Sequence, residues 1–217
     1  MTKLVIIALA IGAGLPVEAH GAPATGEVTG TVIVKDRKDG AGVLVYLEGA
    51  PGTPAVPVGH AVIRQREKQF DPPLTIVVRG ATVDFPNDDK FFHNVFSVSR
   101  PARFDLGLYK SGTTKSVEMK HAGTVDVYCN IHPNMIARVK VLDSAFYTNT
   151  DAQGRFRITG VPPGELAIVA WLPTGDQATG TITVKAGEVV DVKLELSATI
   201  RKDSHLRKDG TPYGRYK

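Results

Sequence analysis

The sequence has little of several features that define common protein classes. It contains one cysteine in 217 residues, so an intramolecular disulfide is impossible and a disulfide-stapled scaffold is excluded. It has six histidines, too few for a multi-histidine copper cluster together with a second metal site. Helical periodicity of useful length, a glycine-rich phosphate loop and a nucleophile paired with a base are also missing. These absences argue against nucleotide-binding and hydrolytic enzymes.

The basic charge of the chain is confined to one end. The formal net charge is +4, and residues 201–217 carry six basic and two acidic side chains, so this segment accounts for the whole excess. The remaining chain is neutral, which argues against nucleic-acid binding. The basic tail is interpreted as a solvated end, or as a segment that docks an acidic partner or an anionic membrane surface.

The first residues have the pattern of a secretory signal. Lys3 precedes an apolar stretch over residues 4–15, and small residues around Ala19 follow. A stretch of about 12 residues is too short for a membrane span of about 20, and no later run is longer. The sequence therefore predicts a signal peptide over residues 1–19, cleaved after Ala19 or Ala22, and a soluble protein without a membrane span in the periplasm or another exported location.

Short alternating runs rich in Val and Thr dominate the rest, with 22 Gly and 14 Pro between them. This pattern predicts an all-β protein. A hairpin is expected over residues 28–47, and a Pro/Gly linker follows at residues 49–59. Seven further strands, enough for a sandwich, are expected at residues 61–66, 75–79, 81–85, 92–98, 115–120, 124–129 and 136–142.

The most informative residues follow the strand that ends at Cys129. Residues 125, 127 and 129 share one phase, which points the thiol into the core. A buried inert cysteine would look the same, but His132 and Met135 follow at positions +3 and +6. Chance rarely produces this spacing at this composition. A tight loop leaving a strand can turn these three side chains toward one point, although Met135 could instead be core packing.

Thiolate, imidazole and thioether together indicate a copper site. Two histidines, one cysteine and a weak axial methionine form the blue-copper electron-transfer centre, in which sulfur favours Cu(I) and imidazole accepts Cu(II). This set requires a second histidine. His93, which is flanked by Phe91, Phe92 and Asn94, supplies it from an upstream strand.

Residues 83–89, His93-Asn94-Val95 and the Cys-x₂-His-x₂-Met loop resemble the cupredoxins, and the loop is similar to that of amicyanin and pseudoazurin. The resemblance covers about residues 60–142. It implies a Greek-key sandwich with one type 1 copper held by His93, Cys129, His132 and Met135, and a hydrogen bond from Asn94 that ties the two ligand loops together. It also implies an apolar partner patch, whose members here would be Ile131, Pro133 and Ile136. Phe92 stands where several relatives have proline, which leaves the wall of the site undefined.

Residues 148–166 resemble the second half of a carboxypeptidase regulatory-like domain, a small transthyretin-like β-sandwich that implies no activity. Because this region is short and residues 27–48 resemble the opening strands of such a module, we expect the N-terminal hairpin to complete it. The alternative is that residues 27–48 extend the cupredoxin sheets. The expected order is a signal peptide (1–19), hairpin and linker (20–59), cupredoxin domain (60–142), regulatory-like domain (143–197) and basic tail (198–217). Proteins of this combined layout are sometimes labelled methylamine-utilisation proteins.

These features predict an exported one-electron carrier that exchanges charge with a redox protein such as a cytochrome or a dehydrogenase. The alternative is a copper-delivery or complex-assembly module without electron-carrier turnover. An oxidase or a copper nitrite reductase is disfavoured because either needs further histidine-bound copper. His60, His121 and His205 are expected to be solvated or in the tail, Trp171 to be core or interface, and Asp88-Asp89 to shape a turn.

Overall fold

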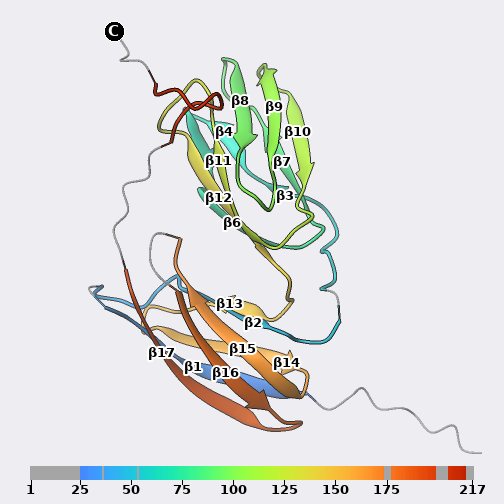
Figure 1. Cartoon of the computed structure of the whole chain (residues 1–217), viewed down its shortest axis with the longest axis vertical. Helices are drawn as coiled ribbons and strands as arrows, with labels where there is room; N and C mark the ends of the chain where they lie inside the picture. Colours follow the sequence, from blue (N-terminus) through green and yellow to red (C-terminus); the bar gives the residue numbers. More distant parts are fainter. Residues whose placement is uncertain (1–24, 36, 53, 174–176, 199–204, 214–217) are drawn as a thin grey trace, which may run out of the picture.

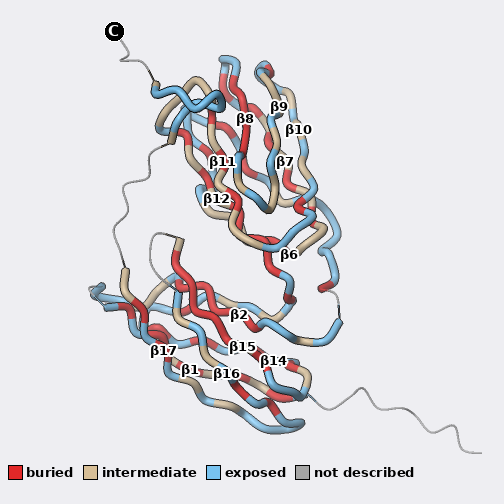
Figure 2. The backbone as a smooth tube through the Cα atoms, in the orientation of Figure 1, coloured by how far each residue is buried: buried red, intermediate tan, exposed pale blue. Residues whose placement is uncertain are grey.

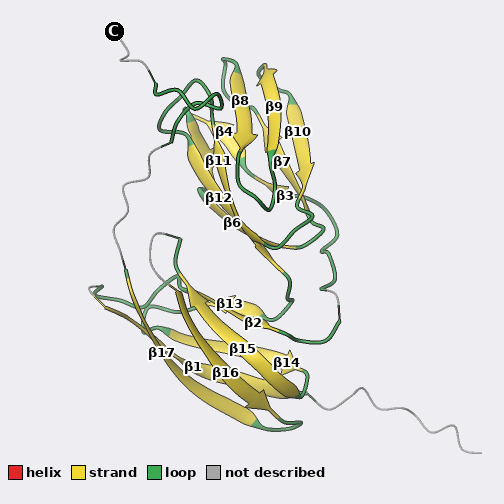
Figure 3. Cartoon of the chain, in the orientation of Figure 1, coloured by secondary structure: helices red, strands yellow, loops and turns green. Residues whose placement is uncertain are grey.

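The protein is described by a computed structural model, which covers residues 25–35, 37–52, 54–173, 177–198 and 205–213. The predicted signal peptide lies outside these residues. The described chain forms strands β1 to β17 and no helix, which confirms the all-β prediction (Figure 3). The strands gather into two bodies along the long axis of the molecule (Figure 1). Among the described residues, there is no helix with the length and apolar character that crossing a bilayer requires.

The lower body in Figure 1 is a sandwich of two sheets. One sheet has the order β14 (Arg155–Val161), β1 (Gly26–Lys35) and β17 (Val189–Ser197). The other has the order β13 (Tyr147–Asn149), β2 (Leu44–Glu48), β15 (Gly164–Trp171) and β16 (Gln177–Val184). Residues alternate between buried and less buried along β1, and its buried side packs with residues of β2 and β15 in one core. We call this body the C-terminal sandwich.

The first strands of the chain pair with its last strands. β1 is antiparallel to β14 and parallel to β17, and β2 is antiparallel to both β13 and β15. In the described chain, neither β1 nor β2 belongs to a sheet of the upper body. Gly30 of β1 allows the close approach of its neighbours, because a Cβ there would lie 2.0 Å from the Val192 carbonyl oxygen. These pairings are the ones that insertion of the upper body into the C-terminal sandwich requires.

The upper body is a second sandwich. Its larger sheet has the order β6 (Leu74–Val78), β12 (Ile136–Leu142), β11 (Gly123–Tyr128), β8 (His93–Ser97) and β9 (Phe104–Tyr109). The facing sheet has the order β10 (Thr114–Glu118), β7 (Thr82–Pro86) and β3 (Ala61–Val62). A short hairpin of β4 (Arg64–Arg66) and β5 (Gln69–Asp71) completes it. Val83 of β7 and Val125 of β11 belong to one buried core, so the sheets pack face to face (Figure 2).

Two strands of this upper sandwich were not expected from the sequence. The expected strand at residues 61–66 divides into β3 and β4, and β5 and β9 were not expected. The apolar residues of β9 do alternate with Asp105 and Gly107, but its burial does not follow period two. Its pairing with β8 is irregular as well, since the register shifts between Asn94 and Phe96.

Tyr109, at the end of β9, ties three segments of the upper sandwich together. Its buried hydroxyl donates to the Phe85 carbonyl at 2.9 Å and accepts from Gln65 Nε2 at 2.5 Å. Burial raises the pKa of Tyr109. Tyr109→Phe would remove two buried hydrogen bonds and leave Gln65 Nε2 and the Phe85 carbonyl with the longer bond of 3.2 Å between them. We therefore expect it to lower the free energy of unfolding by about 1–3 kcal/mol. Urea unfolding measures this loss. Tyr147→Phe, at a more exposed position, should leave stability unchanged, and equal effects of the two variants would contradict the interpretation.

The two sandwiches pack against each other through a separate apolar cluster. Tyr46 and Trp171 of the C-terminal sandwich meet Leu142 of β12 there. Lys140 is 8% exposed, and its ammonium lies 5.2 Å from the centre of the Tyr46 ring and 4.9 Å from that of Trp171. Burial lowers the pKa of Lys140, and the cation–π contacts offset part of the cost of burying its charge. Trp171 is therefore an interface residue.

Candidate metal centre

The residues that could hold a metal lie at the end of the upper sandwich remote from the C-terminal sandwich. His93 is the first residue of β8, and Cys129 directly follows β11. His132 lies in the loop that leads to β12. Because β8 and β11 are neighbours in the larger sheet, their ends bring His93 and Cys129 together (Figure 1).

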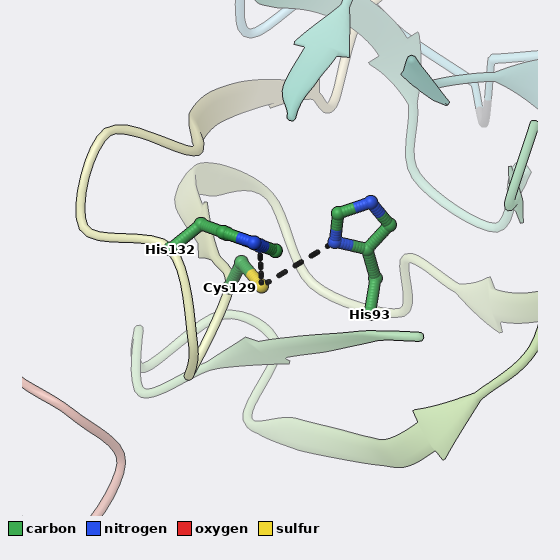
Figure 4. Close-up of side chains that lie close together, drawn as sticks. All are labelled: His93, Cys129 and His132. Atoms are coloured by element: carbon green, nitrogen blue, oxygen red, sulfur yellow. Dashed lines mark hydrogen bonds between the residues drawn. The ribbon is translucent and has the colours of Figure 1, made fainter. Parts of the chain in front are cut away.

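The three side chains converge on one point (Figure 4). Cys129 Sγ lies 3.9 Å from His93 Nδ1 and 3.6 Å from His132 Nδ1. The three donor atoms all lie within 4.8 Å of one another. A metal bonded to nitrogen at about 2.0 Å and to sulfur at about 2.3 Å in a trigonal plane would put Sγ about 3.7 Å from each nitrogen. The donor chemistry and the separations therefore fit a metal ion held by one thiolate and two imidazoles.

The loop that carries Cys129 and His132 is closed by its own backbone. The Met135 amide donates to the His132 carbonyl at 3.1 Å, and the Cys129 amide donates to the Met135 carbonyl at 3.3 Å. The Met135 side chain is fully buried in the core cluster that also contains Cys129. Met135 therefore lies at the end of the same tight loop, directly before β12.

Asp89 fixes the orientation of His93. Its Oδ2 lies 2.7 Å from His93 Nε2, and both side chains are buried. A carboxylate at this place holds the ring proton on Nε2 and leaves the lone pair of Nδ1 facing Cys129. Burial alone would raise the pKa of Asp89, but hydrogen bonds from the Lys68 amide, His93 and the Glu67 amide outweigh it and lower that pKa.

The sequence predicted that Asp89 shapes a turn, and its contact with His93 was not expected. Asp89 lies four residues before His93, and Asp88, its neighbour, pairs instead with Arg64 at the surface. Two adjacent aspartates in a turn give no signal that only one of them faces inward. The spacing from Asp89 to a suspected ligand was the only available clue.

His132 is partly exposed, in contrast to His93. Burial, followed by repulsion from His93 whenever that ring is protonated and from Lys68, lowers its pKa. A lowered pKa keeps the ring neutral to a lower pH, and only the neutral ring has a lone pair for a metal. The two rings lie edge to face, with centroids 4.8 Å apart.

Asn94 bonds to a different partner from the one the resemblance implied. Its Nδ2 donates to Asp105 Oδ1 at 2.7 Å, and its Oδ1 is buried without a hydrogen-bond partner among the described residues. Within the described chain, no hydrogen bond from the Asn94 side chain to the 129–135 loop is present.

The surface around the site is partly apolar. Ile131, Pro133 and Ile136 are each partly exposed. Phe91 and Phe92 are 46% and 57% exposed and lie close to His93 in the chain. They were not among the residues predicted for the apolar partner patch. His60 and His121 are exposed, as expected, whereas His205 is half-buried.

Comparisons with known proteins give two kinds of match. A family model of the carboxypeptidase regulatory-like domain matches residues 132–197, beginning before the boundary at 143 that the sequence predicted. No curated protein matches the chain.

Among solved structures, a copper-containing nitrite reductase from Thermus scotoductus SA-01 is 23% identical, with a TM-score of 0.38, over 43% of this chain and 24% of its own. This chain thus spans about a quarter of the nitrite reductase. A reduced mutant of amicyanin is 25% identical, with a TM-score of 0.37, over 45% of this chain and 98% of its own. A purple cupredoxin from Nitrosopumilus maritimus is 22% identical, with a TM-score of 0.35, over 38% of this chain and 99% of its own. The chain is therefore similar to carboxypeptidase regulatory-like domains in its C-terminal part and has cupredoxins among its structural neighbours, the combination that the sequence predicted.

Proposed function

We propose that the protein is a type 1 copper protein that carries single electrons. The observation that carries this proposal is that Cys129 Sγ lies 3.9 Å from His93 Nδ1 and 3.6 Å from His132 Nδ1. Met135, at the end of the same loop, would be the fourth ligand. Such a set of soft sulfur and neutral imidazole is the one that suits both copper oxidation states.

Bound copper would supply the Cu(II)/Cu(I) couple. Electron exchange is fast only where the ligands hardly move between the two oxidation states. The chain's own residues would therefore keep one ligand geometry for both states. His93 is held by Asp89, and the 129–135 loop is closed by backbone hydrogen bonds between Cys129, His132 and Met135. A site carried by paired strands is more rigid than one on free loops.

His132 is the ligand through which electrons would leave, because it is the partly exposed one. We propose that Ile131, Pro133 and Ile136, joined by Phe91 and Phe92, form the surface that meets a redox protein such as a cytochrome or a dehydrogenase. A small apolar surface supports a weak and short-lived contact. The carrier would be exported, would not be an enzyme, and would comprise a cupredoxin domain over residues 60–142 inserted into a regulatory-like domain.

A redox titration of the copper-loaded protein tests this proposal. A reversible one-electron couple, together with rapid oxidation of the reduced protein by a cytochrome c, is the expected result. Stoichiometric transfer of Cu(I) to a chelating acceptor protein, without reversible cycling, would support a copper-delivery module instead. Absence of copper binding would contradict both functions.

A further inference from the structure

The C-terminal segment, residues 205–213, returns to the loop that carries the ligands (Figure 1). The Lys208 amide donates to Asn130 Oδ1 at 2.9 Å, and the Tyr213 hydroxyl donates to the Cys129 carbonyl at 2.5 Å. Asn130 directly follows Cys129. Two hydrogen bonds from the C-terminal segment therefore end on a predicted ligand and on the residue after it.

Aromatic contacts anchor the C-terminal segment beside the loop. The ring of His205 stacks on Tyr128, with centroids 4.3 Å apart and planes 17° from parallel. The ring of Tyr213 meets His205 edge-on at 5.0 Å, and the guanidinium of Arg207 lies over Tyr213 at 5.5 Å. Burial lowers the pKa of His205, so the stacked ring is neutral at neutral pH. The segment is thus seated by ring packing as well as by hydrogen bonds.

The same segment also reaches β9, the strand that pairs with β8, which carries His93. Lys208 Nζ lies 2.6 Å from Asp105 Oδ2, and Asp105 Oδ1 accepts from Asn94 at 2.7 Å. Asn94 directly follows His93. A continuous path of polar contacts therefore runs from Asn94 through Asp105 and Lys208 to Asn130, and so joins the residues that follow His93 and Cys129.

We propose that the C-terminal segment positions the ligands of the metal centre. Lys208 and Tyr213 are positioning residues, which fix the segments that carry His93 and Cys129 relative to each other. This inference rests on the proposed metal site. Tyr213 acts through the Cys129 carbonyl, and Lys208 acts through Asp105 and Asn130. The basic tail is then more than a solvated end, since its described part contacts the ligand loop in the free protein.

Hydrogen exchange of the metal-free protein tests the contact itself. In Lys208→Met and Tyr213→Phe, the amides of residues 129–135 should exchange about three to ten times faster, because each variant removes one hydrogen bond or ion pair that restrains the loop. The lower figure applies to Lys208, whose ion pair with Asp105 is 44% and 41% exposed and so screened by water. Lys185→Met and Tyr147→Phe, both on the C-terminal sandwich, are the matched controls and should leave this exchange unchanged. Unchanged exchange in both test variants would overturn the proposal.

Spectroscopy of the copper-loaded protein tests positioning. The two test variants should change the relative intensities of the visible thiolate-to-copper bands and shift the reduction potential, and Lys208→Arg should restore both toward the wild type. Faster loop exchange with an unchanged spectrum and potential would overturn the positioning role. If the wild-type protein binds no copper, the proposed function fails, while the exchange experiment still decides whether the segment holds the loop.

Discussion

Cys129→Ser should abolish the intense visible absorption of the copper-loaded protein and weaken copper binding by more than about 100-fold. Losing even a group that only orients a ligand costs about 10–100-fold in metal affinity, and Cys129 is itself the predicted ligand. A serine hydroxyl stays protonated at neutral pH, so it offers neither the negative charge nor the soft sulfur that stabilises Cu(I). Visible absorption after addition of Cu(II), and competition with a chelator for Cu(I), measure the two effects.

Two buried methionines provide a matched comparison for this experiment. Met135 and Met119 are both fully buried in the core of the upper sandwich, but only Met135 lies in the ligand loop. Met135→Leu should change the visible spectrum and raise the reduction potential, whereas Met119→Leu should leave both unchanged. A Cys129→Ser protein that keeps the visible band would contradict the ligand assignment, and circular dichroism of the metal-free variant checks that it is folded.

Removal of the Asp89 carboxylate should have the second largest effect. In Asp89→Ala, the buried His93 ring loses the acceptor that orients it, so copper affinity should fall by about 10–100-fold. The metal-free protein should also lose at least about 1–3 kcal/mol of unfolding free energy, because His93 Nε2 and the Glu67 and Lys68 amides would lose their shared acceptor. Cu(I) competition titration measures the first effect and urea unfolding the second.

Asp88→Ala is the control for Asp89→Ala. Asp88 is the adjacent residue, has the same side chain and forms an exposed ion pair with Arg64. Such pairs contribute about 0–1 kcal/mol, so Asp88→Ala should alter stability little and copper binding not at all. Asp89→Asn keeps an acceptor oxygen without its charge and should fall between Asp89→Ala and the wild type. Equal affinities of Asp88→Ala and Asp89→Ala would show that Asp89 does not orient His93.

Local sequence patterns predict the parts of this molecule that depend on neighbouring residues. The period-two phase of the strand before Cys129 and the spacing to His132 led to two side chains that the structure brings together. His93 was chosen because copper chemistry needs a second imidazole and the surrounding residues resemble cupredoxins. The contact between Asp89 and His93 depends on how a turn folds inward, which residue types alone do not encode.

The C-terminal segment was the hardest part to interpret from sequence. Residues 201–217 have no strand pattern, and their basic charge is typical of a solvated end. In the described part, residues 205–213, the contacts include single side chains, such as His205 on Tyr128 and Tyr213 on the Cys129 carbonyl. No periodicity accompanies contacts of this kind, because the segment docks without joining a sheet.

The parallel pairing of β1 with β17 has a consequence for how the chain matures. During synthesis, β1 emerges from the ribosome early, but the strand that lies beside it is made only after the whole upper sandwich. Until then, the β1 edge is open to pairing with other molecules, the condition in which nascent β proteins aggregate. Closing this long loop in the chain is slow relative to local folding. The upper sandwich can therefore fold first, while β1 stays unpaired until β14 and β17 have been made.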